Sequence, residues 1–191
     1  MELNPKDKAS RKAAVRPAAM PAAKSKAKAV NIEEFYGGLI KVETVSSLPP
    51  EMIRGIYSTE LITRHNIITS GVSPEVFTVL AKSMYRSKED LATLLGLSVT
   101  TIDRKAKLGE KLSSDQGERV VGMAKLIGQV QAMVDESGDP TEFDAAQWVA
   151  EWLDKPLPAL GDHRPAEYLR TAEGRDLVSR TLTMMQSGAY A

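Results

Sequence analysis

Apolar residues recur at helical spacings through most of the chain, and strand-like character is confined to one short stretch. Phe77, Leu80 and Met84 lie three and four residues apart after a Ser-Pro start signal, so they share one helix face. A longer apolar face follows the serines at 113 and 114 and consists of Val120, Ala124, Ile127, Val130 and Val134. The pattern predicts an all-α protein, with strand character only at residues 38–45.

Start and stop signals divide the chain into three segments. Order should begin near Asn31, and the prolines at 49 and 50 predict a helix start near Glu51. The turn cluster Ser137–Pro140 predicts a boundary between two domains. Beyond it, helices are expected at residues 143–153, 165–169 and 174–186. We therefore expect a flexible basic arm at 1–30, a first helical domain at 31–137 and a small second helical domain at 138–191.

The apolar residues of the second domain are expected to form its core. The last helix should bury a face made of Leu177, Val178, Leu182 and Met185. Trp148 and Trp152 lie one helical turn apart, and we expect both in the core, together with Met184.

The segment from Ser87 to Lys107 carries the strongest local signal. A helix-turn-helix needs a small residue where its helices cross, a glycine in the turn and an apolar residue inside the second helix. Ala92, Gly96 and Ile102 supply these in order, and their spacing resembles that of DNA-binding helix-turn-helix domains. A helical hairpin that never contacts DNA can carry the same residues, and that alternative stays open.

The second helix of this motif would enter the major groove. Its candidate DNA-binding residues are Ser98, Thr100, Thr101, Arg104, Lys105 and Lys107. Arg104 is suited to a bidentate contact with guanine, whereas the lysines, Ser98 and Thr100 are suited to phosphate. Lys105 occupies a position where many such motifs have an apolar residue.

Charge and composition bear on partners and exclude several classes of protein. The formal net charge is zero, but residues 1–30 carry eight Lys/Arg against two acids, and residues 135–191 carry eleven Asp/Glu against five Lys/Arg. This asymmetry indicates two different partners. The chain has no cysteine, and its two histidines are far apart in sequence, so we expect no metal site, no cofactor and no enzymatic activity. Without a long apolar run or a signal peptide, a cytoplasmic protein is expected.

The C-terminal third has its own sequence motifs. They are the tryptophan helix, Leu160-Gly161 with Arg164-Pro165, the Thr171–Arg175 helix start, and the ending Gly188–Tyr190. In this order they closely resemble the toxin-binding domain of the Xre/MbcA/ParS antitoxin family, and the resemblance extends from about Met52 to the last residue. It implies a toxin-binding domain after the helix-turn-helix domain.

The resemblance also implies a partner. In that family the partner is usually a RES-domain toxin that consumes NAD or transfers ADP-ribose, and the antitoxin's C-terminal segment covers the toxin's active-site cleft. The implied toxin-binding residues are Arg164, Arg175, Gly188, Ala189, Tyr190 and Ala191. Tyr190 would stack where a cofactor ring sits, and the Ala191 carboxylate would meet cationic groups. For Arg164 and Arg175, an internal structural role is an equal alternative.

The function expected from the sequence is that of an antitoxin that also binds operator DNA and represses its own operon. A homodimer is expected because such domains read paired half-sites, with residues 31–68 or 114–134 as the contact surface. Two alternatives remain open. One is a stand-alone regulator whose C-terminal domain senses a ligand, and the other is a pure inhibitor whose helix-turn-helix no longer binds DNA.

Overall fold

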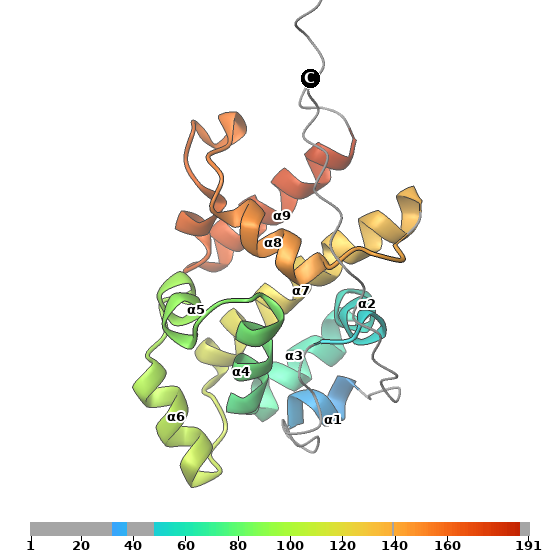
Figure 1. Ribbon diagram of the computed structural model, residues 1–191. Coiled ribbons are helices and arrows are strands. Elements are labelled where there is room, and N and C mark those ends of the chain that lie inside the picture. Colours follow the sequence, from blue (N-terminus) through green and yellow to red (C-terminus); the bar gives the residue numbers. More distant parts are fainter. Residues whose placement is uncertain (1–31, 38–47, 139, 188–191) are drawn as a thin grey trace, which may run out of the picture.

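The computed structural model describes residues 32–37, 48–138 and 140–187, and its regular elements are all helical (Figure 1). The all-α prediction is confirmed for these residues. Their β-type backbone pairing is limited to an isolated bridge between Leu157 and His163. The predicted basic arm and the strand character at 38–45 lie outside the described residues. None of the described helices has the length and apolar character needed to cross a membrane.

In chain order the helices are α1 (Ile32–Gly37), α2 (Pro50–Ser58), α3 (Leu61–Ser70), α4 (Pro74–Ser83), α5 (Lys88–Leu95), α6 (Val99–Leu108), α7 (Ser114–Ser137), α8 (Ala145–Leu153) and α9 (Ala172–Gln186). Two short 3-10 helices, η2 (Pro158–Leu160) and η3 (Pro165–Tyr168), lie between α8 and α9. The helices expected at 143–153 and 174–186 correspond to α8 and α9, and the one expected at 165–169 is the 3-10 helix η3.

Local capping explains where several helices begin and end. The Ser87 hydroxyl accepts the backbone N–H of Asp90 at 3.0 Å, and the Ser98 hydroxyl accepts that of Thr101 at 3.3 Å. Ser113 forms a complete capping box at the start of α7. By contrast, no side chain caps the start of α3, and Ile67 is the residue of this helix that is buried. Neither a capping residue nor a periodic apolar face therefore marks α3 in the sequence.

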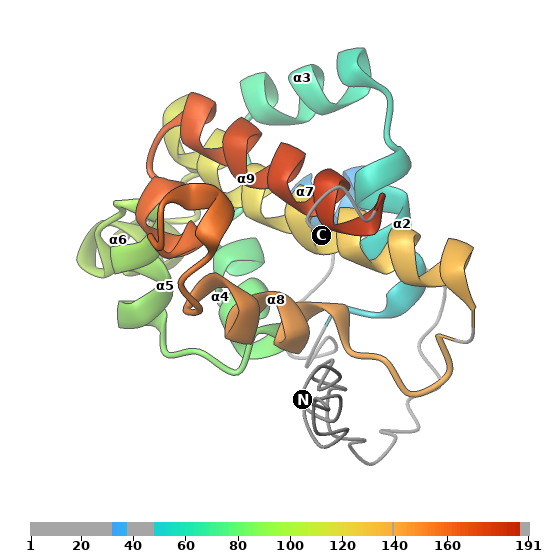
Figure 2. The same cartoon turned by 90° about the horizontal axis from the view of Figure 1, so that it is seen from above.

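Helix α7 runs through the middle of the molecule, and α2, α3, α4, α8 and α9 all pack against it (Figures 1 and 2). Its predicted apolar face is buried at Val120, Ala124, Ile127 and Val130. The same helix therefore supports both the segments that precede it and the segments that follow it.

The predicted buried face of α9 is partly wrong. Val178 and Leu182 are buried, but Leu177, Met184 and Met185 are 38%, 40% and 37% exposed. These three side chains are exposed, contrary to the prediction, because α9 packs against the core through a different face. Arg175 and Thr181 are buried on that face together with Val178. For the tryptophans, Trp152 is buried and Trp148 is half-buried against it, with ring centroids 5.9 Å apart.

The contact between α2 and α7 yields a prediction about stability. A Cβ atom on Gly128 of α7 would lie 2.6 Å from the Ile53 carbonyl oxygen, which belongs to the backbone of α2. Gly128→Ala should therefore lower the free energy of unfolding by about 1–3 kcal/mol, as overpacking does, despite the better helix propensity of alanine. Urea unfolding measures this effect. Gly37→Ala is the control because no atom lies within 4 Å of its Cβ position, and an equal loss there would contradict the assignment.

Candidate functional site

Helices α5 and α6 form the helix-turn-helix expected from the sequence. Gly96 ends α5 in the left-handed conformation, with φ of 63°. The Leu97 N–H donates to the Ala92 carbonyl at 2.8 Å and the Gly96 N–H donates to that of Thr93, which closes the last turn of α5. Ala92 and Ile102 are both buried, and α4 packs against both helices. The landmark residues thus hold a tight two-helix unit.

The candidate DNA-binding residues differ in their exposure and in whether the side chain already has a hydrogen-bond partner within the chain. Thr100, Arg104 and Lys107 are exposed along α6, and Thr101 is half-buried. The Ser98 hydroxyl is used as the helix cap. The ammonium of Lys105, a candidate phosphate contact, donates to the Lys111 carbonyl at 2.8 Å, so this lysine already has a partner within the chain.

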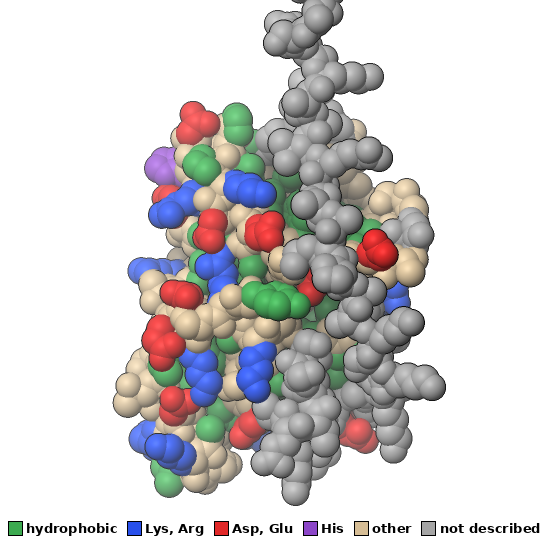
Figure 3. Space-filling view, in the orientation of Figure 1, with side chains coloured by type: hydrophobic (Ala, Val, Ile, Leu, Met, Phe, Trp, Pro, Cys, Tyr) green, Lys and Arg blue, Asp and Glu red, His purple; other side chains and the backbone are tan. Residues whose placement is uncertain are grey.

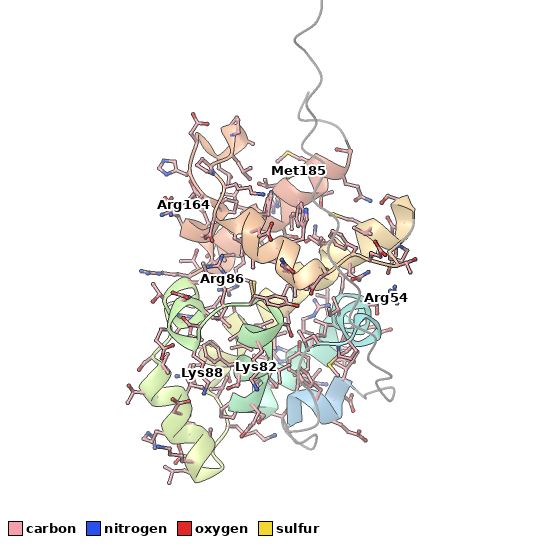
Figure 4. The ribbon with its side chains drawn as sticks, viewed as in Figure 1. Arg54, Lys82, Arg86, Lys88, Arg164 and Met185 are labelled. Carbon is pink, nitrogen blue, oxygen red and sulfur yellow. The ribbon has the colours of Figure 1, made fainter. Side chains whose placement is uncertain are left out.

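Acidic residues pair with basic ones on the surface of this unit, whose sequence at 82–111 carries seven Lys/Arg against four Asp/Glu. Asp103 of α6 pairs with Lys88 of α5 at 2.8 Å, and Glu110 pairs with Arg104 at 3.3 Å. Figure 3 shows Lys and Arg side chains interleaved with Asp and Glu on the visible face, and Figure 4 places Lys82 and Lys88 near the α4–α5 side of the unit. On the face seen in Figure 3, the charge of this unit is therefore mixed.

Tight turns build the segment between α8 and α9. Gly161 and Asp162 both have positive φ, at 65° and 62°, and the Leu157 N–H donates to the His163 carbonyl at 3.1 Å. After this turn, Glu167 accepts hydrogen bonds from His163 and Arg164, and these bonds hold the pKa of the Glu167 carboxyl below its usual value. Arg164 itself is exposed at the edge of the molecule (Figure 4).

The Thr171–Arg175 motif has a packing explanation. Thr171 caps α9 by accepting the Gly174 N–H at 3.1 Å. A Cβ on Gly174 would lie 1.8 Å from the Tyr168 carbonyl oxygen, so no side chain fits at this position. Arg175 is 7% exposed, donates to the Leu169 carbonyl at 3.0 Å and pairs with Glu118 of α7. The motif fastens the start of α9 to α7.

Comparison with known proteins assigns both parts of the chain. Residues 63–125 match the antitoxin Xre-like helix-turn-helix domain, and residues 138–188 match the antitoxin Xre/MbcA/ParS C-terminal toxin-binding domain. The chain is also 38% identical, over 143 residues, to a Prs ADP-ribosylating antitoxin of Sphingobium sp. (strain YBL2). That match covers 75% of this chain and 90% of the relative.

The chain belongs to the Xre/MbcA/ParS antitoxin family. It is the antitoxin of a toxin–antitoxin system, and its toxin-binding domain implies a toxin partner. The family expected from the sequence is therefore confirmed, and the alternative of a stand-alone ligand-sensing regulator loses its support.

Within the toxin-binding domain of this antitoxin, exposed apolar side chains gather on α9. Leu177 and Met184 are seven residues apart and share a face of the helix, and Met185 lies beside them near the helix end (Figure 4). They are the large hydrophobic side chains that are exposed in the described part of this domain. We call them the α9 apolar face. The predicted tail residues Gly188, Ala189, Tyr190 and Ala191 lie outside the described residues.

The two candidate arginines can be separated by experiment. Arg175→Ala should cost about 2 kcal/mol in unfolding free energy, because it leaves the Leu169 carbonyl without its charged donor and removes the packed side chain. Arg164→Ala should leave the free energy of unfolding almost unchanged, since the pair that Arg164 forms with Glu167 is exposed to solvent. Thermal and urea unfolding compare the two variants. Equal stability losses would refute the internal role of Arg175.

Proposed function

We propose that this antitoxin neutralises a RES-domain toxin that uses NAD to transfer ADP-ribose, and that its C-terminal segment covers the toxin's active-site cleft. The observation that carries this proposal is the α9 apolar face, which lies in the matched toxin-binding domain and ends directly before the tail. The similarity to the Prs ADP-ribosylating antitoxin of Sphingobium supports ADP-ribosylation rather than NAD degradation as the chemistry of the system.

The proposed interface has two parts. The α9 apolar face supplies buried area, since Leu and Met side chains adapt to a partner surface. The tail supplies specificity, with Tyr190 stacking in the cleft and the Ala191 carboxylate meeting cationic groups. Arg164 is exposed and pairs with Glu167, so it would have to exchange this pair for a toxin contact, whereas Arg175 positions α9 from within.

Removing the tail tests its role in the interface, and a charge in the α9 apolar face tests the role of that face. Deletion of residues 188–191 should abolish protection of cells that express the toxin encoded beside this antitoxin, and should leave DNA affinity unchanged. Met184→Asp should weaken the purified complex at least about tenfold, because it places a charge in an apolar contact. Lys155→Asp, an exposed change next to α8, is the control. Full protection by the truncated antitoxin would refute the role of the tail.

We also propose that α6 reads operator DNA and that the antitoxin represses its own operon. The match to the Xre-like helix-turn-helix domain supports this, together with the exposure of Thr100, Arg104 and Lys107. Arg104 would exchange its surface pair with Glu110 for a guanine edge, at small cost because exposed ion pairs are weak. Because the unit has mixed charge, the basic arm at 1–30 would add phosphate contacts.

Two substitutions on α6 separate base reading from phosphate binding. Arg104→Ala should relax base preference at one operator position by about 1–3 kcal/mol. Lys107→Ala should weaken binding to all sequences and reduce the slope of log affinity against log salt by about 0.9. Fluorescence anisotropy with operator and scrambled duplexes measures both effects. DNA affinity that does not depend on salt would favour the pure-inhibitor alternative instead.

We propose that the antitoxin forms a homodimer through the corner between α2 and α3. Tyr57, Leu61 and Ile62 are 39%, 80% and 62% exposed there, which leaves a large apolar surface uncovered in one chain. Of the two candidate surfaces, residues 31–68 are favoured because α7 is covered by its neighbours.

Charged substitutions at this corner test the dimer. Ile62→Asp together with Leu61→Asp should convert the dimer to a monomer in light scattering, because a two-fold contact buries each charge twice. Leu108→Asp is the matched control, since Leu108 is 61% exposed but lies at the end of α6. A dimer that survives the double substitution would exclude this corner as the contact.

A further inference from the structure

The first helix of the helix-turn-helix, α5, is held at both ends by contacts with the toxin-binding domain. At its N-terminal end, Arg86 reaches across to the last turn of α8 (Figure 4). One nitrogen of its guanidinium donates to the Ala150 carbonyl at 2.6 Å and pairs with the Asp154 carboxylate at 2.6 Å. The Arg86 side chain is only 17% exposed, whereas that of Asp154 is 53% exposed, so the Ala150 carbonyl is the more sheltered of its two partners.

At the C-terminal end of α5, arginines from two other elements meet its last carbonyls. Arg170, from the segment before α9, donates to the Thr93 carbonyl at 3.2 Å. Arg119 of α7 donates to the carbonyls of Leu95 and Gly96 at 3.2 and 3.0 Å. Cationic groups at this position satisfy the orphan carbonyls of the helix end and complement its negative dipole.

The Arg170 contact starts from a fixed piece of backbone. The preceding residue, Leu169, is buried, and its carbonyl is held by Arg175. The following residue, Thr171, caps α9. Both neighbours of Arg170 are therefore anchored. Through its hydrogen bond to the Thr93 carbonyl, the Arg170 guanidinium links the start of α9 to the turn that leads into α6.

We propose that Arg86 and Arg170 are positioning residues for DNA binding, through which the toxin-binding domain sets the placement of α5 and therefore of α6. The proposal rests on the DNA binding proposed above. It has a regulatory consequence: whatever the toxin does to the α8–α9 region is transmitted to the DNA-reading helices, and DNA must influence toxin affinity by the same factor.

Arg170→Ala in the full-length antitoxin tests this proposal, with Arg180→Ala as the control. Both variants lose one positive charge, and Arg180 is exposed on α9. The probe is a duplex of the intergenic DNA upstream of the antitoxin's own coding sequence. Arg170→Ala should weaken binding about three- to tenfold at every salt concentration, without changing the salt slope, and Arg180→Ala should match the unsubstituted antitoxin. Arg170→Lys should recover part of the loss.

Two outcomes of the binding experiment would overturn the proposal. One is equal affinity in Arg170→Ala and Arg180→Ala. The other is a loss of affinity accompanied by a reduction of about 0.9 in the salt slope, which would make Arg170 a phosphate contact. Thermal unfolding and toxin neutralisation should be unchanged in Arg170→Ala, because the Arg170 side chain is exposed and lies apart from the α9 apolar face.

Hydrogen exchange in the free antitoxin separates this proposal from the proposed DNA binding. The backbone amides of residues 97–101 should exchange faster in Arg170→Ala than in Arg180→Ala. Unchanged exchange would refute the positioning role whether or not DNA binds. Faster exchange in an antitoxin that fails to bind any DNA would refute the DNA-binding proposal and leave the structural link between the two domains in place.

Discussion

The close approach of neighbouring elements to α7 is the packing constraint on which the rest of this structure depends. Three of its glycines lie in close contacts: a Cβ on Gly128 would meet the backbone of α2, one on Gly122 would meet the Arg175 side chain at 2.8 Å, and one on Gly117 would meet the Val72 side chain at 3.0 Å. Each glycine in a helix interior costs about 1 kcal/mol relative to alanine. Close packing on three sides offsets this cost and makes α7 a common support.

Both functional regions of the antitoxin depend on that support. Arg175 fits against Gly122 and fastens α9 to α7, which fixes where the α9 apolar face points. Arg119 extends from α7 to the end of α5 and helps to hold the turn before α6. In Figure 1, α6 and the C-terminal end of α9 lie at opposite ends of the molecule. The shared core thus joins the proposed DNA-reading helix and the proposed toxin-binding face at a distance from each other.

Features encoded by near neighbours were predictable from the sequence. The turn glycine Gly96 and the helix that follows Ser113 depend on residues within a few positions, and both are found. The features that were missed depend on residues far away in the chain. The burial of Arg175 requires Glu118 and the Leu169 carbonyl, which a helical periodicity cannot reveal, and the exposure of Leu177 and Met185 follows from that.

The candidate site shows the same division between local and distant information. The helix-turn-helix could be located from the spacing of its residues. The ion pairs Lys88–Asp103 and Arg104–Glu110 on its surface depend on how the folded segments meet. Helix α3 was missed because it has no side-chain cap and buries little of its surface. The role of the tail comes from family resemblance, since its four residues have no pattern that physical reasoning can interpret.

Hydrogen–deuterium exchange on the antitoxin, with the adjacent toxin and with operator DNA added separately, tests the central claim most directly. The claim is that one core supports two separate binding surfaces, with the toxin bound at the outer side of α9 and DNA at α6. Toxin should protect residues 177–191 strongly and change exchange at residues 99–108 far less than DNA does, and DNA should protect residues 99–108 strongly and affect residues 177–191 far less than toxin does. Protection of α6 by toxin as strong as that by DNA, or no protection of α9 in a stable complex, would contradict the account.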